Sequence, residues 1–185
     1  MLSSITDWDF SVLDKMDGIR NEVLTAILKV FTHLSDGGIF WIALCLVLLI
    51  IPKTRRIGIY ASCALLLEFL LGEVTLKHII RRERPFIQDP TIDTIIKHPG
   101  GFSFPSGHSA SSVATALSIF LQNKKLGAPL LVVAVIVMFS RVYFKVHFFT
   151  DIIAGCLLGI AASLFIYYLF KHIEKKRHFA DNENN

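Results

Sequence analysis

Long apolar blocks, separated by short charged or turn-forming segments, fill most of this chain. Hydrophobic residues occupy 53% of its 185 positions, and the mean hydropathy of +0.56 is too high for an ordinary soluble domain of this length. A helix needs about 20 predominantly apolar residues to cross a bilayer, and it satisfies its backbone hydrogen bonds internally. The sequence therefore predicts an all-α, polytopic membrane bundle with a single membrane-embedded domain over residues 1–185.

We expect six transmembrane helices, bounded by turn signals or charged residues. Their expected ranges are about 18–34, 39–51, 57–84, 106–121, 127–143 and 150–173. Pro85 disfavours continuation of the third helix because a proline restricts the residue before it. Residues 1–17 alternate acidic with aromatic and aliphatic residues. That pattern suits a short interfacial helix and equally a flexible lead-in.

Basic residues predict the orientation of these helices in a cell membrane. An even number of spans places both termini on one side, together with a set of basic residues. These are Lys53, Arg55, Arg56, Lys124, Lys125, Lys171, Lys175, Lys176 and Arg177. Because lysine and arginine are enriched in cytoplasmic segments, we expect this side and both termini to be cytoplasmic. The loop around residues 86–104, which is longer than typical connections, then lies on the extracytoplasmic side.

Three polar clusters fall at the ends of apolar segments on the opposite face from the termini. They are Lys77-x6-Arg84-Pro85, Pro105-Ser106-Gly107-His108 and Ser140-Arg141-x5-His147-x3-Asp151. They bring an excess of cations to a face where the charge rule predicts few. Binding of an anion would explain this excess.

The first cluster places two cations on one helix face. Lys77 and Arg84 are seven residues apart, a rotation of about 700 degrees, so on an unbroken helix they lie two turns apart on the same side. Glu73 lies one turn before Lys77 and is a supporting residue that can pair with it. Cations that extend toward the headgroups from a helix end are the alternative explanation.

The second cluster leads into the expected fourth helix. Free amides at a helix start bind phosphate readily, and Gly107 allows a close approach of the backbone. Ser106 fits such a site, but a serine that simply caps the helix explains its position equally well. His108 is the residue that a plain cap does not explain.

The third cluster offers an oriented nucleophile. If the segment is helical, His147 and Asp151 stand one turn apart, so the carboxylate can hold one ring nitrogen and leave the other free to attack. Arg141 is six residues earlier, about 240 degrees away on an unbroken helix. Its convergence with His147 therefore requires a break near residues 144–149. A structural pair or half of a metal site is the alternative for His147 and Asp151.

Together the clusters supply three cations, a helix start and two histidines. This set fits a tetrahedral, multiply charged anion, with one histidine attacking in line and the other protonating the leaving oxygen. Phosphoryl transfer is the predicted reaction class. We expect no metal, because carboxylates are few and the cations would repel a divalent ion. We also expect no nucleic-acid partner, because the basic residues lie between apolar blocks and not on one soluble surface.

At these residues the chain resembles the type 2 phosphatidic acid phosphatase (PAP2) superfamily. The three motifs of that superfamily, KxxxxxxRP, PSGH and SRxxxxxHxxxD, are matched in order without substitution. The resemblance implies that His147 is the nucleophile that forms a phosphohistidine, with Asp151 orienting it and His108 acting as general acid. It also implies a metal-independent enzyme without a cofactor. The implied phosphoryl-binding groups are Lys77, Arg84, Arg141, Ser106 and the amide of Gly107.

The resemblance further implies hydrolysis of a lipid phosphate or diphosphate at the extracytoplasmic membrane face. Its candidate substrates are undecaprenyl diphosphate, phosphatidylglycerophosphate, phosphatidic acid and lipid A. One subgroup of undecaprenyl diphosphatases carries PSDH and a degraded first motif, whereas this chain has Gly107 and an intact Lys77, which weakens the diphosphate assignment without removing it. The alternatives are a lipid-to-lipid phosphotransferase and a non-catalytic protein that binds or transports a lipid phosphate. We expect the lipid bilayer and no obligate protein partner.

Overall fold

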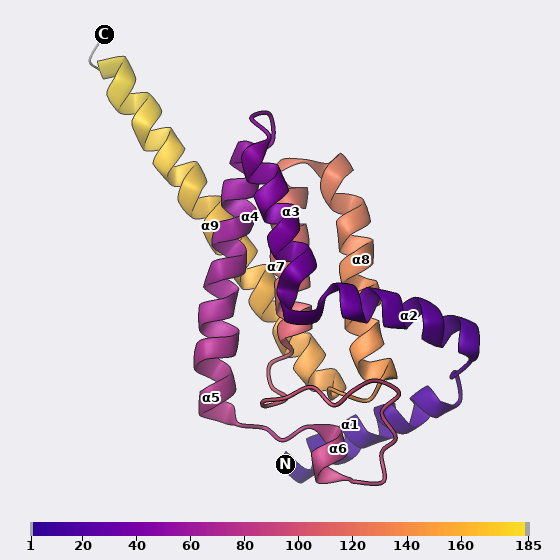
Figure 1. Cartoon of the computed structure of the whole chain (residues 1–185). Coiled ribbons are helices and arrows are strands. Elements are labelled where there is room, and N and C mark those ends of the chain that lie inside the picture. Colours follow the sequence, from indigo (N-terminus) through magenta and orange to yellow (C-terminus); the bar gives the residue numbers. More distant parts are fainter. Residues whose placement is uncertain (1, 184–185) are drawn as a thin grey trace.

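The computed structural model describes residues 2–183 as a chain of helices (Figure 1). The longer helices are α1 (Leu2–Asp17), α2 (Glu22–Leu34), α3 (Ile39–Ile50), α4 (Arg55–Phe69), α7 (Gly107–Gln122), α8 (Lys124–Tyr143) and α9 (Phe149–Glu183). The shorter ones are a 3₁₀ turn (Asp36–Gly38), a π-helix (Leu70–Leu76), α5 (Lys77–Ile80) and α6 (Pro85–Gln88). No β-strand occurs between residues 2 and 183, and the predicted all-α class is confirmed.

Helix α7 lies at the centre of the bundle, where it packs against α4, α8 and α9. Its buried positions include the small residues Ser109, Ala110, Ser112, Ala114 and Ala116. A Cβ atom added to Gly155 of α9 would lie 2.4 Å from the carbonyl oxygen of Ser106, and one on Gly159 would lie 2.6 Å from that of Ala110. Small residues let helix backbones approach closely in membranes. The two glycines of α9 therefore serve packing inside the bundle.

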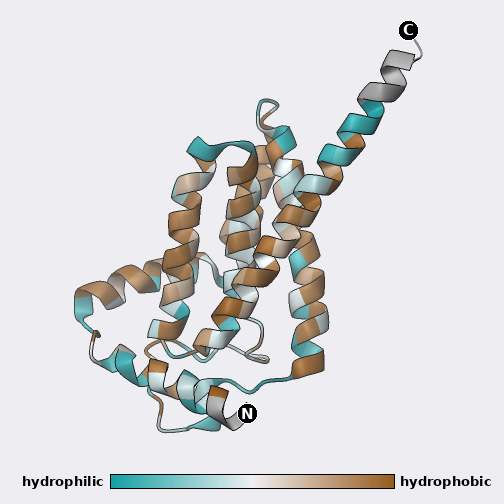
Figure 2. Cartoon of the chain, turned by 180° about the vertical axis from the view of Figure 1, so that it is seen from behind, coloured by the Kyte–Doolittle hydropathy of each residue, from teal (hydrophilic) through white to brown (hydrophobic). Residues whose placement is uncertain are grey.

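The outer surface of the bundle is apolar along its length. Figure 2 shows hydrophobic residues along the long helices and hydrophilic residues toward the ends of the bundle and in the part of α9 that precedes its grey end. Within the described chain, three helical stretches are long and apolar enough to cross a membrane: Arg55–Gln88, Lys124–Tyr143 and Phe149–Arg177. Helices α2 and α3 form a pair bent by 45° that brings this number to four if the pair is one span. A multi-pass membrane protein is therefore supported, whereas the count of six spans stays a prediction.

The helix expected over residues 57–84 ends earlier than predicted. A π-helix follows α4, α5 stops at Ile80, and Arg81 adopts a left-handed backbone conformation with φ 52°. Residues 81–84 then lead to Pro85, which occupies the first turn of α6, a position that suits proline. Arg84 is therefore not on the same helix as Lys77. The expectation that the two cations lie two turns apart on one helix face is wrong.

The segment before the first expected span is helical. Helix α1 covers the segment predicted as either an interfacial helix or a flexible lead-in, and it buries Leu13 completely against Phe148 and Ile152. The next helix begins at Glu22 and not at residue 18, because Asn21 caps it by accepting from the amide of Leu24 at 2.8 Å. The placement of α1 at a membrane interface stays a prediction.

Helix α1 and the late part of α9 lie at opposite ends of the bundle. Asp9 of α1 accepts a hydrogen bond from the amide of Thr150, where α9 begins, at 3.0 Å. Glu174, late in α9, instead pairs with Arg56 at the start of α4 at 2.5 Å, and Figure 1 shows α9 extending away from α1. Both termini were expected on one face of the bundle. In this structure α1 and α2 instead lie at the end where α9 starts, and the late part of α9 lies at the other end.

Replacement of Gly159 tests the close packing of α9 on α7. Gly159→Ala should lower the melting temperature in detergent, because overpacking typically costs about 1–3 kcal/mol and exceeds the gain of up to about 1 kcal/mol in helix propensity. Gly100→Ala is the control, since nothing lies within 4 Å of its added Cβ. A Gly159→Ala variant that melts at or above the wild-type temperature would contradict this packing.

Candidate active site

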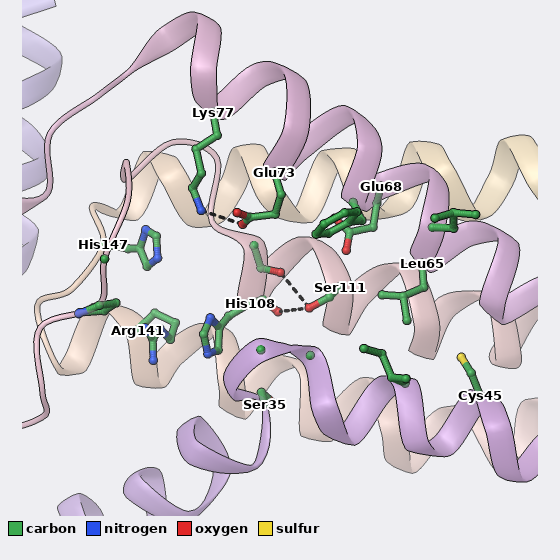
Figure 3. A pocket seen from close by; sticks show the side chains of 18 of the residues that line it. Ser35, Cys45, Leu65, Glu68, Glu73, Lys77, His108, Ser111, Arg141 and His147 are labelled. Carbon is green, nitrogen blue, oxygen red and sulfur yellow. Dashed lines mark hydrogen bonds and ion pairs between the residues drawn. The ribbon is translucent and has the colours of Figure 1, made fainter.

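A cavity of about 600 Å³ opens at the end of the bundle where the three sequence clusters meet (Figure 3). Most of the predicted site residues line it: Glu73, Lys77, Arg84, Gly107, His108, Arg141 and His147. Of the nine predicted residues, Ser106 and Asp151 are fully buried and do not line the cavity. The structure thus brings together side chains from α5, α7 and α8 and from the segments that precede α6 and α9.

Arg84 is held by the two loops on either side of it. Its guanidinium donates to the carbonyl oxygens of Gly100 and Gly101 at 3.0 Å each and to that of Val146 at 2.9 Å. Its Nη1 also lies 3.1 Å from Nε2 of His147. These contacts fix Arg84 at the cavity although its backbone is outside the helix that was predicted to carry it.

Lys77 forms the pair with Glu73 that the sequence indicated. The ammonium group donates to Oε1 of Glu73 at 2.6 Å, and Lys77 is largely buried. The same carboxylate lies against Gly107, because a Cβ atom there would be 2.1 Å from Oε1 of Glu73. The absence of a side chain at residue 107 therefore allows the Glu73–Lys77 pair to approach the start of α7.

Ser106 is the cap of α7. Its hydroxyl accepts hydrogen bonds from the amide of Ser109 at 3.4 Å and from the Ser109 hydroxyl at 3.1 Å. This satisfies one of the free amides of the first turn, as the capping alternative predicted. The Ser106 hydroxyl is engaged inside the protein, whereas Gly107 faces the cavity.

Arg141 reaches the cavity from the last turn of α8. It is almost fully buried, and its Nη1 donates to the hydroxyl of Thr32 in α2 at 2.5 Å. Helix α8 ends at Tyr143, Lys145 has a φ of 54°, and α9 begins at Phe149. The predicted break between Arg141 and His147 is confirmed, and it is what lets both side chains line one cavity.

The contacts of His147 determine which of its nitrogens is unprotonated. A guanidinium nitrogen can only donate, so Nε2 of His147 accepts from Arg84 and keeps its lone pair. The ring proton is then on Nδ1, which faces Oγ of Ser103 at 3.4 Å and Oδ2 of Asp151 at 3.6 Å. Burial lowers the pKa of His147 to about 3. His147 is therefore a neutral imidazole whose Nε2 lone pair is occupied by the hydrogen bond from Arg84.

Asp151 is fully buried and is held by three donors that the motifs do not include. Its Oδ2 accepts from the hydroxyl of Ser103 at 2.5 Å and from the amide of Phe148 at 2.9 Å. Its Oδ1 accepts from Arg82 at 2.8 Å, and Arg82 also donates to Asp9 at 2.7 Å. Ser103 and Asp9 were not selected from the sequence because their partners are distant along the chain.

The charge balance of the cavity suits an anion. Arg84 is hydrogen-bonded to carbonyl oxygens and an imidazole, and Arg141 to a hydroxyl, so neither cation is hydrogen-bonded to a carboxylate. Among the described residues, no group of three His, Cys, Asp or Glu side chains is placed to bind a metal ion. Preorganised cations of this kind stabilise negative charge that develops during a reaction.

Fold and cavity together define a helical membrane protein with a cationic site that carries two histidines. The chain belongs to the PAP2 superfamily, whose family model matches residues 56–175. The predicted family is therefore confirmed.

Two relatives and one solved structure show how far the similarity extends. The chain is 38% identical over 137 residues to an undecaprenyl-diphosphatase of Sulfolobus acidocaldarius, covering 71% of this chain and 64% of that protein, which is less than two thirds of its length. It is 33% identical over 138 residues to the bacitracin transport permease protein BcrC of Bacillus licheniformis, covering 73% and 68%. The crystal structure of a transmembrane PAP2 type phosphatidylglycerolphosphate phosphatase from Bacillus subtilis superposes with a TM-score of 0.74 at 25% identity, covering 92% and 88%.

The Asp9–Arg82 pair can be tested through stability. Asp9→Ala should lower the melting temperature in detergent, because removing one partner of a buried ion pair costs about 3–5 kcal/mol. Asp14→Ala is the matched control, since Asp14 is an exposed carboxylate on the same helix. Equal melting temperatures for the two variants would show that α1 does not brace this end of the bundle.

Proposed function

We propose that this protein is a membrane lipid phosphatase that transfers a phosphoryl group to His147 and then to water. The observation that carries the proposal is the convergence of Lys77, Arg84 and Arg141 with two histidines at one cavity. The part of that cavity away from the histidines is mostly apolar and runs between α3 and α4. Its lining there includes Ile42, Cys45, Leu46, Leu65 and Phe69. A ligand with a phosphate head and an apolar tail fits both parts.

In the first step, the phosphoryl oxygens take the place of Nε2 as acceptors for Arg84. This exchange frees the lone pair of His147, which attacks phosphorus while Asp151 stabilises the charge that develops on the ring. His108 gives a proton to the leaving oxygen as the P–O bond breaks. The remaining cations, Lys77 and Arg141, with the Gly107 amide, stabilise the phosphoryl oxygens. Ser106 supports this amide by capping α7.

In the second step, water attacks the phosphohistidine. The N–P bond breaks, inorganic phosphate leaves, and His108 takes a proton from the water, so both histidines return to their starting states. Nothing in this cycle requires a cofactor, because the cations and the helix start already supply the positive charge that a loose phosphoryl transition state needs.

We propose that the active-site end faces the extracytoplasmic side of a cell membrane and that the chain is one domain over residues 1–185. Support comes from the basic residues where α4 and α8 begin, at the other end of the bundle from the cavity. These are Lys53, Arg55, Arg56, Lys124 and Lys125. By the positive-inside rule that end is cytoplasmic, as is the basic segment late in α9. Helix α1, at the active-site end, would lie at the outer membrane surface.

The phosphohistidine is the first testable consequence. Purified protein should release phosphate from a lipid phosphate with a chelator present, and acid-labile label should appear on the protein when turnover of a ³²P-labelled substrate is quenched rapidly. His147→Ala should abolish both, lowering turnover by a factor of about 10⁴ or more as loss of a nucleophile does. Full activity in that variant would overturn the mechanism.

The substrate class and the two alternatives can be separated in one panel of lipids. The panel contains phosphatidic acid, phosphatidylglycerophosphate, undecaprenyl diphosphate and lipid A, each assayed for free phosphate and for labelled lipid products. We expect free phosphate as the main product, because the cycle ends with water. Transfer of label to a second lipid would favour a phosphotransferase. Tight binding without turnover would favour a binding or transport protein, a reading that the name of the Bacillus licheniformis relative supports.

A further inference from the structure

The predicted general acid is hydrogen-bonded to a carboxylate that lies outside all three motifs. Asp36 belongs to the short turn between α2 and α3, upstream of the residues that the family model matches. Its Oδ1 is 3.0 Å from Nε2 of His108, and its Oδ2 is 3.0 Å from Nδ1 of His33. One carboxylate thus lies between two imidazoles, one facing the cavity and one exposed.

The local backbone is shaped to put Asp36 there. Gly37 and Gly38, which follow it, have φ values of 61° and 70°, a left-handed region that favours glycine. The turn they form packs against the start of α7 and lines the cavity together with Ser35. The position of the Asp36 carboxylate beside His108 is therefore a consequence of this turn.

The other charged groups around His108 oppose its protonation. Burial disfavours a charged ring most strongly, and Arg141 and Arg84 act on it as nearby cations. Asp36 is the carboxylate hydrogen-bonded to His108 in the described chain. Because an ionised carboxylate only accepts, the contact requires a proton on Nε2. Nδ1, which has no hydrogen-bond partner among the described residues, is then the nitrogen left to donate.

We propose that Asp36 is a positioning residue for His108: it keeps a proton on Nε2 and stabilises the doubly protonated ring that acts as general acid. The proposal rests on the proposed phosphatase function. In the first step the Nδ1 proton passes to the leaving oxygen as the P–O bond breaks, and His108 becomes neutral. In the second step Nδ1 takes a proton from the attacking water. Asp36 stays ionised throughout, so its effect is on the acid strength and orientation of His108.

Leaving-group dependence tests this role. An alkoxide needs a proton to leave, whereas a nitrophenolate does not, so general-acid catalysis matters for the first only. The substrates are dodecyl phosphate and a nitrophenyl phosphate with the same alkyl chain. For Asp36→Asn, which keeps the shape and removes the charge, we expect kcat on dodecyl phosphate to fall about tenfold and kcat on the aryl ester to change less than about twofold.

The ratio of the two kcat values in one preparation is the readout, because it does not depend on the fraction of folded protein. His108→Ala should change this ratio in the same direction and by about 10²-fold. The double variant should be no worse than His108→Ala, since both changes act through one group. His33→Gln, which alters only the outer contact of Asp36, and Asp89→Asn, an exposed carboxylate bonded within its own turn, should keep the wild-type ratio.

The outcomes separate this proposal from the phosphatase function. An Asp36→Asn variant with an unchanged ratio, or with both substrates slowed equally, would overturn the positioning role while the wild-type activity stands. A wild-type protein that hydrolyses neither ester would instead remove the proposed function itself. If the double variant changed the kcat ratio more than His108→Ala alone does, that result would also count against Asp36 acting through His108.

Discussion

The burial of Asp151 is the constraint on which the active-site end of this protein depends. An ionised carboxylate without solvent exposure costs several kcal/mol unless it is paired and hydrogen-bonded, so its partners must come from elsewhere in the chain. The Phe148 amide, the Ser103 hydroxyl and the Arg82 guanidinium supply the hydrogen bonds. Arg82 in turn pairs with Asp9. One buried charge therefore ties the N-terminal helix, the long loop and the start of α9 into a single unit beside His147.

The cations divide into two groups with different consequences for ligand binding. Arg82 is neutralised by two buried carboxylates and stabilises the fold. Arg84 and Arg141 are instead held by carbonyl, imidazole and hydroxyl groups, which fix their position without cancelling their charge. Such preorganised positive charge binds an anion without first breaking an ion pair. Lys77 is intermediate, because its pair with Glu73 lies at the cavity wall.

The sequence predicted the features that depend on local pattern and missed those that depend on distant contacts. Apolar blocks, the helix start after Ser106 and the break between Arg141 and His147 follow from composition, capping and helix geometry. The helix predicted over residues 57–84 stops at Ile80, and this was missed because Arg81 adopts a left-handed conformation that non-glycine residues seldom take. Asp9 and Asp36 were missed because their partners are 141 and 72 residues away, and no periodicity connects positions so far apart.

The bent junction between α2 and α3 places two polar side chains beside residues that line the cavity. The two helices have 13 and 12 residues, and each alone is shorter than the roughly 20 residues that a span needs. Side chains near their junction contact the candidate site: Thr32 accepts a hydrogen bond from Arg141, and Asp36 is hydrogen-bonded to His108. The 45° bend falls at the turn that carries Asp36, so that Thr32 contacts a side chain of α8 while Asp36 contacts one of α7, both at the candidate site.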